Sequence, residues 1–254
     1  MESQRRHMGG RNWVVDFTRL VGLTGRVLFP HFCLSCGAEG ELLCGQCETK
    51  YALQRGILFS CNSLAGIDNR RAETVQSAKT PYVGDIRCFS AGRYADPVLR
   101  TLLHLYKYER VSEAGEILAR IFVHSASRQI GAILAGSSEP VVVPLPMNQF
   151  NQAFRGFNQS ESFARIFAGD FELEIDKNLL KKRFSLRTQA HLSGVQQRMR
   201  NVQNSFIVRA DRQLPEEIIL VDDVFTTGAT IRSCVTALRQ AGVAKIFVAT
   251  VLKS

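Results

Sequence analysis

The stretch Ile218–Thr230 constrains the fold of this chain more than any other part of the sequence. Its first four residues are apolar and are typical of a short strand buried on both faces, as in a parallel sheet. Two adjacent carboxylates, Asp222 and Asp223, come next, and after a turn of small residues the spacing of residues 231–240 is helical. The stretch therefore predicts a strand that ends at the acidic pair, a loop, and the N-terminus of a helix.

The loop after the acidic pair has the chemistry of a phosphate site. A helix N-terminus presents unpaired backbone N–H groups and the positive end of the helix dipole. Glycine lets the backbone approach a ligand closely, and threonine adds hydroxyl donors. Adjacent carboxylates can accept hydrogen bonds from the two vicinal hydroxyls of a ribose. We therefore predict a ribose-phosphate site at Asp222 and Asp223 and at the loop residues Thr226, Thr227, Gly228, Ala229 and Thr230.

Two other interpretations of the same stretch stay open. It could be an ordinary strand–helix turn in which Thr226 or Thr227 caps the helix and the carboxylates face solvent. It could also be an acidic pair that binds a metal ion directly. Of the three interpretations, only the ribose-phosphate site requires the stretch to bind a sugar phosphate.

Four of the seven cysteines form two C-x-x-C pairs, at Cys33, Cys36, Cys44 and Cys47. Two such pairs can present four thiolates to one tetrahedral ion. Because four thiolates leave no open coordination position, we predict a structural zinc ion, with a redox dithiol or an iron–sulfur cluster as the alternatives. A module this small depends on its metal for a stable fold.

The chain has 254 residues, enough for one sizeable core and a small extra module, and a formal net charge of +9. From Lys177 to Arg209 there are eight Lys or Arg residues and no Asp or Glu. This basic stretch could be a solvated face, a site for a substrate's phosphates, or a contact with a polyanion such as nucleic acid. Charges interrupt the apolar positions of Trp13–Leu28, so we expect an amphipathic helix there and neither a signal peptide nor a transmembrane segment. These features predict a cytoplasmic protein.

Three segments are predicted along the chain: an N-terminal helix and zinc-binding module in residues 1–60, a connector in 61–84, and an α/β domain in 85–254. Residues 48–84 show no clear periodicity and are interpreted as irregular. The predicted elements of the α/β domain are a strand or hairpin in 86–94, a helix from Pro97 with Asp96 as its N-cap, a helix over 112–130, a strand in 141–146, a helix over 159–167 that Asn158 caps, and a strand over 246–252.

Two loops of this domain are candidates for contact with an anion. Arg155 and Gly156 follow the strand in 141–146, and the carboxyl ends of parallel strands are where α/β sheets place their ligands. The long polar segment between the strand ends near residues 180 and 206 contains Arg187 and is typical of a functional lid. Lys107, near the end of a helix, could reach a phosphate or the last carbonyl groups of its own helix.

The stretch around Asp222 and Asp223 resembles the phosphoribosyl pyrophosphate (PRPP) binding motif of type I phosphoribosyltransferases. With its other motifs in their order, the chain resembles the ComF family, also called ComFC or GntX-like. The pieces that carry this resemblance are Phe29-Pro30 with the four cysteines, His104–Tyr108, Val143–Pro146 with Arg155–Gln159, Arg187–Gln189 through Arg200–Val202, and Val221–Thr230. The resemblance implies a type I phosphoribosyltransferase-like parallel sheet flanked by helices, with a small N-terminal zinc-binding module. Many family members carry a further cysteine pair, where this chain has only Cys61, so a second zinc site is not expected.

By this resemblance, Asp222 and Asp223 hold the ribose hydroxyls, residues 226–230 bind the 5′-phosphate, and Arg155, Gly156 and Arg187 face pyrophosphate. Asp222, Asp223 and Arg187 would be the catalytic residues, and Mg²⁺ would accompany PRPP. The family is linked to natural transformation and to the use of DNA as a nutrient. That link implies single-stranded DNA as a partner, with a competence helicase or other DNA-processing proteins.

Three functions fit these expectations. The first is a competence-associated protein that binds PRPP and single-stranded DNA, with or without phosphoribosyl transfer. The second is a nucleobase salvage phosphoribosyltransferase, and the third is a PRPP-sensing regulatory protein that binds nucleic acid without turnover. Because a fold and a ligand site do not establish turnover, the sequence leaves open whether the chain is an enzyme and which acceptor it would use.

Overall fold

The structure is a computed structural model that describes residues 32–54, 56–60, 86–134, 139–147, 152, 155–183, 206–209 and 213–254. Contacts between residues divide the chain into two compact units, Met1–Cys44 and Gly45–Ser254. Of the residues before the predicted boundary at residue 60, Ile57–Ser60 pair with the sheet of the second unit. The predicted helix within residues 1–30, Cys61 with the connector, and Arg187 in the predicted lid lie outside the described residues.

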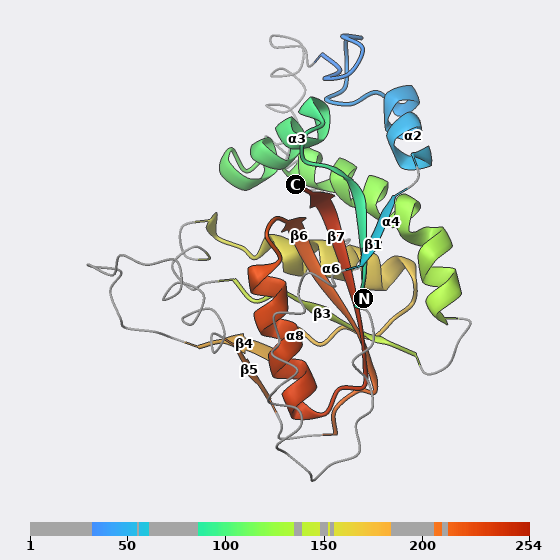
Figure 1. Cartoon of the computed structure of the whole chain (residues 1–254). Helices are drawn as coiled ribbons and strands as arrows, with labels where there is room; N and C mark the ends of the chain where they lie inside the picture. Colours follow the sequence, from blue (N-terminus) through green and yellow to red (C-terminus); the bar gives the residue numbers. More distant parts are fainter. Residues whose placement is uncertain are drawn as a thin grey trace, which may run out of the picture. The chain divides into compact units, whose positions relative to one another are not determined.

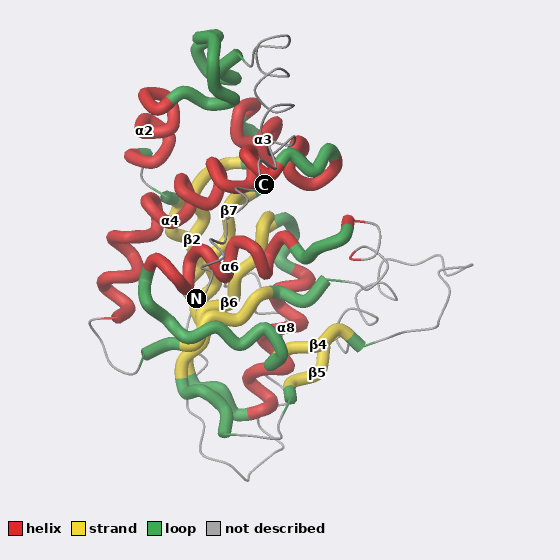
Figure 2. Tube along the Cα trace, turned by 180° about the vertical axis from the view of Figure 1, so that it is seen from behind, coloured by secondary structure: helices red, strands yellow, loops and turns green. Residues whose placement is uncertain are grey.

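The second unit has a mostly parallel sheet with helices on both faces (Figures 1 and 2). Its elements in chain order are α2 (Gly45–Leu53), β1 (Ile57–Ser60), β2 (Arg87–Arg93), α3 (Pro97–Tyr108), α4 (Ser112–Leu134), β3 (Val141–Pro144), α6 (Gln159–Asp170), β4 (Leu180–Lys182), β5 (Phe206–Val208), β6 (Glu217–Phe225), α8 (Ala229–Ala241) and β7 (Lys245–Lys253). The five-stranded sheet has the order β1-β2-β7-β6-β3, and β4 pairs with β5 separately. The strands β2, β7, β6 and β3 run parallel, and β1 is antiparallel to β2. The predicted α/β class with a parallel sheet flanked by helices is confirmed.

Strand β6, which lies between β7 and β3, is buried because apolar side chains cover it from both sides. Ile218 and Leu220 lie in one core cluster with apolar residues of α8. On the opposite face lie α4 and α6 (Figure 2). Phe122 of α4 packs against Phe167 of α6 there, with 5.1 Å between ring centroids. Alternate side chains of β6 therefore pack against two different helical layers. This explains why its sequence is a continuous apolar run and does not alternate between apolar and polar residues.

The interpretation of residues 48–84 as irregular is wrong for α2 and β1. Helix α2 is held against α4 by Arg120, whose Nε lies 2.6 Å from Glu48 Oε1. Strand β1 pairs with β2, with Ile57 opposite Ser90. Both elements are short, and contacts with residues distant in the sequence stabilise them, so local periodicity does not reveal them.

Helix α3 begins where β2 ends, and its cap is the one expected from the sequence. The Asp96 carboxylate accepts hydrogen bonds from the N–H groups of Val98 at 2.9 Å and Leu99 at 3.0 Å, and Pro97 is the first helical residue. The N–H of Tyr94 donates to the carbonyl of Lys253 at the end of β7, at 2.8 Å. These bonds place α3 at the carboxyl end of the sheet.

Strand β6 continues past the acidic pair, so the prediction that the strand ends at Asp222 and Asp223 is wrong. Pairing with β7 extends to Phe225, which lies opposite Lys253, and the carbonyl of Phe225 accepts a further bond from the N–H of Ser254. The two carboxylates therefore belong to a rigid, paired segment, and the loop begins at Thr226.

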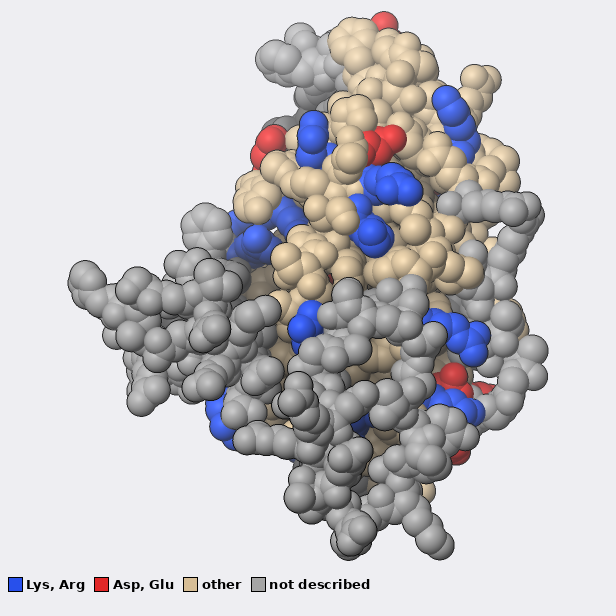
Figure 3. Space-filling view, viewed as in Figure 1, with Lys and Arg blue, Asp and Glu red and all other residues tan. Residues whose placement is uncertain are grey.

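Strands β4 and β5 form a short antiparallel pair, with Leu180 opposite Val208, which matches the strand ends predicted around the polar segment. On the face of the molecule shown in Figure 3, Lys and Arg side chains predominate over Asp and Glu across the described surface. Among the described helices, none combines the length and the apolar character needed to cross a membrane.

Candidate functional site

Asp222 lies on β6 with its carboxylate buried against the N-terminus of α6. Its Oδ1 accepts a hydrogen bond from Ser160 Oγ at 2.9 Å and another from the N–H of Asp223 at 2.8 Å. Burial, and then the charge of Asp223, raise the pKa of Asp222 from 3.8 to about 7, against the opposing effect of those hydrogen bonds and of Lys107. A carboxyl group with this pKa is partly protonated at neutral pH, so it can donate as well as accept a hydrogen bond.

Asp223 faces the opposite direction and forms an ion pair with Lys107 of α3. The Lys107 Nζ lies 2.5 Å from Asp223 Oδ2, and the two side chains are only 13% and 14% exposed. The lysine side chain is therefore directed at Asp223 and is mostly withdrawn from solvent. It places a positive charge directly beside the acidic pair.

The loop after β6 turns at Gly228, whose φ of 69° lies in the left-handed region that favours glycine. Gly228 is the N-cap of α8 and has no side chain with which to bond the first N–H groups of the helix. Neither Thr226 nor Thr227 is therefore the N-cap residue itself, although Thr227 Oγ1 accepts a hydrogen bond from the N–H of Ala229, the first helical residue, at 3.5 Å. Thr226 and Thr227 are exposed, beside the start of a helix that extends from Ala229 to Ala241.

The start of α6 forms the other wall of the site. Asn158 caps this helix, as predicted, by accepting a bond from the Ser160 N–H at 3.2 Å, and its own amide donates to the carbonyl of Leu145 just after β3 at 3.1 Å. Arg155 Nη1 donates to Gln159 Oε1 at 3.1 Å. Gln159 is fully buried, and among the described residues its Nε2 finds no acceptor.

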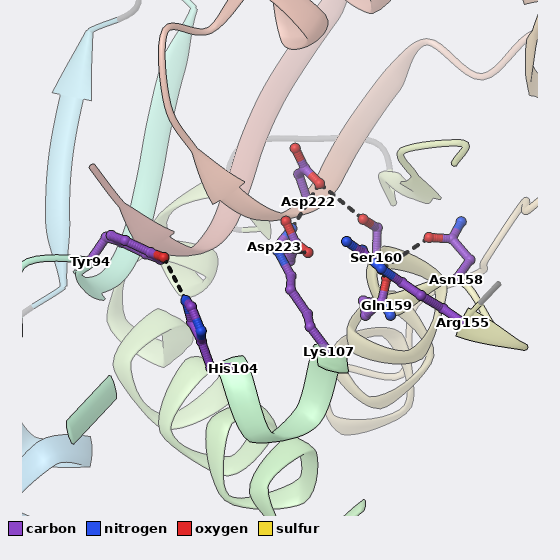
Figure 4. A network of polar contacts seen from close by, with 9 residues as sticks. All are labelled: Tyr94, His104, Lys107, Arg155, Asn158, Gln159, Ser160, Asp222 and Asp223. Atoms are coloured by element: carbon purple, nitrogen blue, oxygen red, sulfur yellow. Dashed lines mark hydrogen bonds and ion pairs between the residues drawn. The ribbon is translucent and has the colours of Figure 1, made fainter. Parts of the chain in front are cut away.

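Side chains from three elements converge at the carboxyl end of β6 (Figure 4). Lys107 comes from α3, Ser160 from α6 and Arg155 from the turn before α6, and all three point toward the acidic pair. The predicted residues Asp222, Asp223 and Arg155 are thus brought together, with Gly156 next to Arg155. Gly156 has a φ of 83°, which glycine adopts readily.

Sequence reasoning missed the places of Ser160 and Gln159 in this site and the partner of Lys107. Ser160 and Gln159 occupy the first turn of α6, directly after a predicted cap, and the cap marks where a helix starts but not what its first turn touches. Lys107 was considered for a phosphate or for helix carbonyl groups, and its partner is Asp223. No local pattern could reveal that pair, because it joins α3 to a strand far along the chain.

The four cysteines near the N-terminus have the arrangement of a metal site. The sulfur atoms of Cys33, Cys36, Cys44 and Cys47 all lie within 4.8 Å of one another. The Cys36 and Cys44 sulfurs are 3.7 Å apart, close to the roughly 3.8 Å expected for two sulfurs each about 2.3 Å from one tetrahedral zinc ion. These four thiols can therefore bind a metal such as zinc.

The surroundings of Cys33 favour the thiolate that a metal requires. Burial alone would raise its pKa, but hydrogen bonds from the backbone of Cys44, Cys36 and Ser35, together with the Cys36 thiol, lower the pKa from 9.0 to about 6. One of these is the Cys44 N–H, which lies 3.4 Å from the Cys33 sulfur. N–H groups aimed at sulfur are what a cluster of metal-binding thiolates needs.

Comparison with known proteins shows several relatives. The chain is 30% identical over 163 residues to DNA utilization protein YhgH of Escherichia coli strain K12, which covers 63% of this chain and 69% of that protein. It is 28% identical over 157 residues to Competence protein F of Haemophilus influenzae, covering 61% and 67% of the two chains. Over 102 residues it is 34% identical to Competence protein ComFC of Streptococcus pneumoniae, covering 40% of this chain and 42% of that protein.

No protein-family model matches the chain. Competence protein F and YhgH nevertheless each align with more than 60% of the chain, and YhgH is 30% identical with 69% of its length covered. On this basis the chain belongs to the ComF family.

Proposed function

We propose that this protein acts in DNA uptake and in the use of imported DNA, and that it binds PRPP with Mg²⁺ at the carboxyl end of β6. The names of its relatives, competence protein and DNA utilization protein, support the first part. The acidic pair beside Gly228 and the start of α8 supports the second. In this proposal the sheet unit is a type I phosphoribosyltransferase-like domain, and the four cysteines hold a structural zinc ion.

The observation that carries the PRPP proposal is the position of Asp222 and Asp223 near the end of β6, one short loop before the N-terminus of α8. Two vicinal ribose hydroxyls can hydrogen-bond to the carboxyl groups, while the sugar's 5′-phosphate lies against the backbone N–H groups at the start of α8. Gly228 keeps a Cβ away from that phosphate. Because Asp222 is partly protonated near neutral pH, the pair carries less negative charge than two ionised carboxylates, which weakens its repulsion of the ligand's phosphates.

The proposed pyrophosphate end of the ligand lies toward Arg155 and α6. Arg155 is positive, and the fully buried Gln159 amide beside it has a donor, Nε2, that finds no acceptor among the described residues. A buried donor without a partner costs free energy, which a ligand oxygen would relieve. Mg²⁺ is held mainly by phosphate oxygens in such complexes, so it requires few protein ligands.

If the site catalyses transfer, the bond between the ribose anomeric carbon and pyrophosphate breaks, and the electron pair leaves with pyrophosphate. The acceptor forms the new bond to that carbon and loses a proton. The ribose ring is positively charged in the transition state, so the carboxylates of the acidic pair stabilise it electrostatically, and Arg155 and Lys107 offset the charge of the leaving group.

We also propose that the protein binds single-stranded DNA through basic surface. The formal charge of +9 and the basic stretch Lys177–Arg209 support this, as does the predominance of Lys and Arg on the face shown in Figure 3. Neutralising phosphates releases counterions, so we expect the affinity to fall steeply with salt concentration.

The test is PRPP binding by calorimetry and pyrophosphate release, each with Mg²⁺. Single-stranded DNA and a panel of nucleobases are offered as acceptors. The double variant Asp222→Asn, Asp223→Asn should lose PRPP binding, while the control Asp170→Asn, an exposed carboxylate at the end of α6, should retain it.

Release of pyrophosphate that needs one acceptor would establish a transferase and identify its substrate. PRPP binding without pyrophosphate release, whichever acceptor is offered, would support the PRPP-sensing function instead. Absence of PRPP binding by the wild-type protein would contradict the ligand proposal itself.

A further inference from the structure

Tyr108, the last residue of α3, is a large aromatic side chain that is 59% exposed. The guanidinium carbon of Arg155 lies over its ring, 5.3 Å from the ring centroid. The His104 ring meets it edge-on, with 5.4 Å between centroids and 61° between planes. Single exposed apolar residues are common on protein surfaces, but this ring has an arginine over its face and a second aromatic ring at its edge.

The surroundings hold this ring in place. His104 lies one helical turn before Tyr108 on α3, and its Nε2 is 2.9 Å from the hydroxyl oxygen of Tyr94. Arg155 is held in turn by its bond to Gln159. Because these contacts restrict the ring before any ligand arrives, a ligand that stacks on it loses little free energy to ordering.

Tyr108 also adjoins the proposed ribose-phosphate site. The residue before it, Lys107, contacts Asp223, and Arg155 contacts both Tyr108 and the first residue of α6. A molecule stacked on Tyr108 would therefore lie beside the acidic pair. Since Tyr108 is 59% exposed, Arg155 and His104 leave much of the ring open for such contact.

We propose that Tyr108, flanked by Arg155 and His104, is a stacking platform for an unpaired nucleobase next to the ribose-phosphate site. This inference rests on the proposed function and adds to it the position of the base. Any of the nucleobases can stack its planar face on tyrosine or arginine, so the contact does not depend on which base is present. The base can come from a single-stranded DNA chain or from a free nucleobase that acts as acceptor, and both have the same face to present.

The first experimental arm measures binding of a fluorescent oligothymidylate by anisotropy, beside an abasic oligomer with the same phosphates and no bases. Tyr108→Ala should weaken oligothymidylate binding by about 5-fold to 100-fold, the range that corresponds to one lost stacking contact. Tyr108→Phe should restore it. Binding of the abasic oligomer, and the slope of affinity against salt for both oligomers, should not change, because stacking releases no counterions.

The matched control is Leu58→Ala, which removes a similarly exposed apolar side chain from β1, at 58% exposure. It should bind both oligomers as the wild type does. Equal weakening of the abasic and the base-containing oligomer by Tyr108→Ala would overturn the proposal, because the ring would then act on phosphates or on the fold.

The second arm measures pyrophosphate release with free nucleobases. A higher KM for the base in Tyr108→Ala, with unchanged oligomer binding and unchanged PRPP binding, would support the platform and identify a free base as its occupant. Wild-type behaviour of Tyr108→Ala in both arms would overturn it. Failure of the wild-type protein to bind PRPP would instead refute the proposed function, so the two failures are distinguishable.

Discussion

Lys107 and Asp223 form an ion pair that joins the last turn of α3 to strand β6, with both side chains almost fully withdrawn from solvent. In such surroundings each charge depends on the other, because removal of one leaves the second desolvated and unpaired. The pair therefore links the stability of this corner of the fold to the charge of the candidate site.

Replacing Lys107 by methionine should destabilise the protein. We expect the free energy of unfolding to fall by about 1–3 kcal/mol, because Asp223 loses its charged partner in a largely buried position. Urea unfolding at pH 7 measures the change. The control is Arg165→Met, which breaks an exposed pair with Glu161 within α6 and should cost at most about 0.5 kcal/mol. Equal effects of the two variants would show that the Lys107 pair is no stronger than a surface pair.

The pKa of Asp222, raised from 3.8 to about 7, makes stability depend on pH. Because the folded pKa lies above the unfolded one, the folded state binds the proton more tightly, and the resulting stability is lost as pH rises from about 4 to about 7. Asp222→Asn should remove this loss. The difference in unfolding free energy between variant and wild type should shift in favour of the variant, by at most about 1.4 kcal/mol per pH unit, and level off above pH 7.

Urea unfolding of both proteins between pH 5 and pH 8 gives that difference directly. The exposed carboxylate variant Asp170→Asn is the control and should track the wild type over the whole range. A flat difference for Asp222→Asn would mean that Asp222 is ionised throughout, as a solvated carboxylate would be.

Substitution of the two glycines at opposite ends of α8 can distinguish the effect of backbone strain from the effect of ligand contact. Gly228 and Gly242 both have left-handed φ angles, of 69° and 106°. Alanine at either position should cost about 1–2 kcal/mol of stability, because a Cβ disfavours this region. Gly228→Ala should in addition weaken PRPP binding about tenfold or more, since its methyl group meets the phosphate, whereas Gly242→Ala should bind PRPP normally. Calorimetry would contradict the proposed phosphate position if both variants bound PRPP equally well.

The four-cysteine cluster should hold one zinc ion per chain. Cys44→Ser should lose that zinc, as measured by elemental analysis of the purified protein, because three thiolates bind the ion far less tightly than four. Cys234→Ser, at a buried cysteine of α8 outside the cluster, should keep it. Iron or labile sulfide in the wild-type protein, with no zinc, would favour an iron–sulfur cluster.

Local sequence patterns predicted those parts of the fold whose causes are local. A capping side chain bonds N–H groups two or three residues away, so Asp96 and Asn158 could be recognised without a structure. The C-x-x-C pairs brought four thiols together by short connections, and the continuous apolar run before Asp222 is what a strand covered on both faces requires.

Tertiary structure decided what depends on distant neighbours. The extent of β6 past the acidic pair follows from its pairing with β7, and α2 and β1 exist because α4 and β2 offer them partners. The burial that raises the pKa of Asp222 comes from the start of α6, and the charge beside Asp223 comes from α3. A sequence states which groups are present, whereas desolvation and ion pairing depend on which elements are packed together, so these properties of the site appear only in the folded chain.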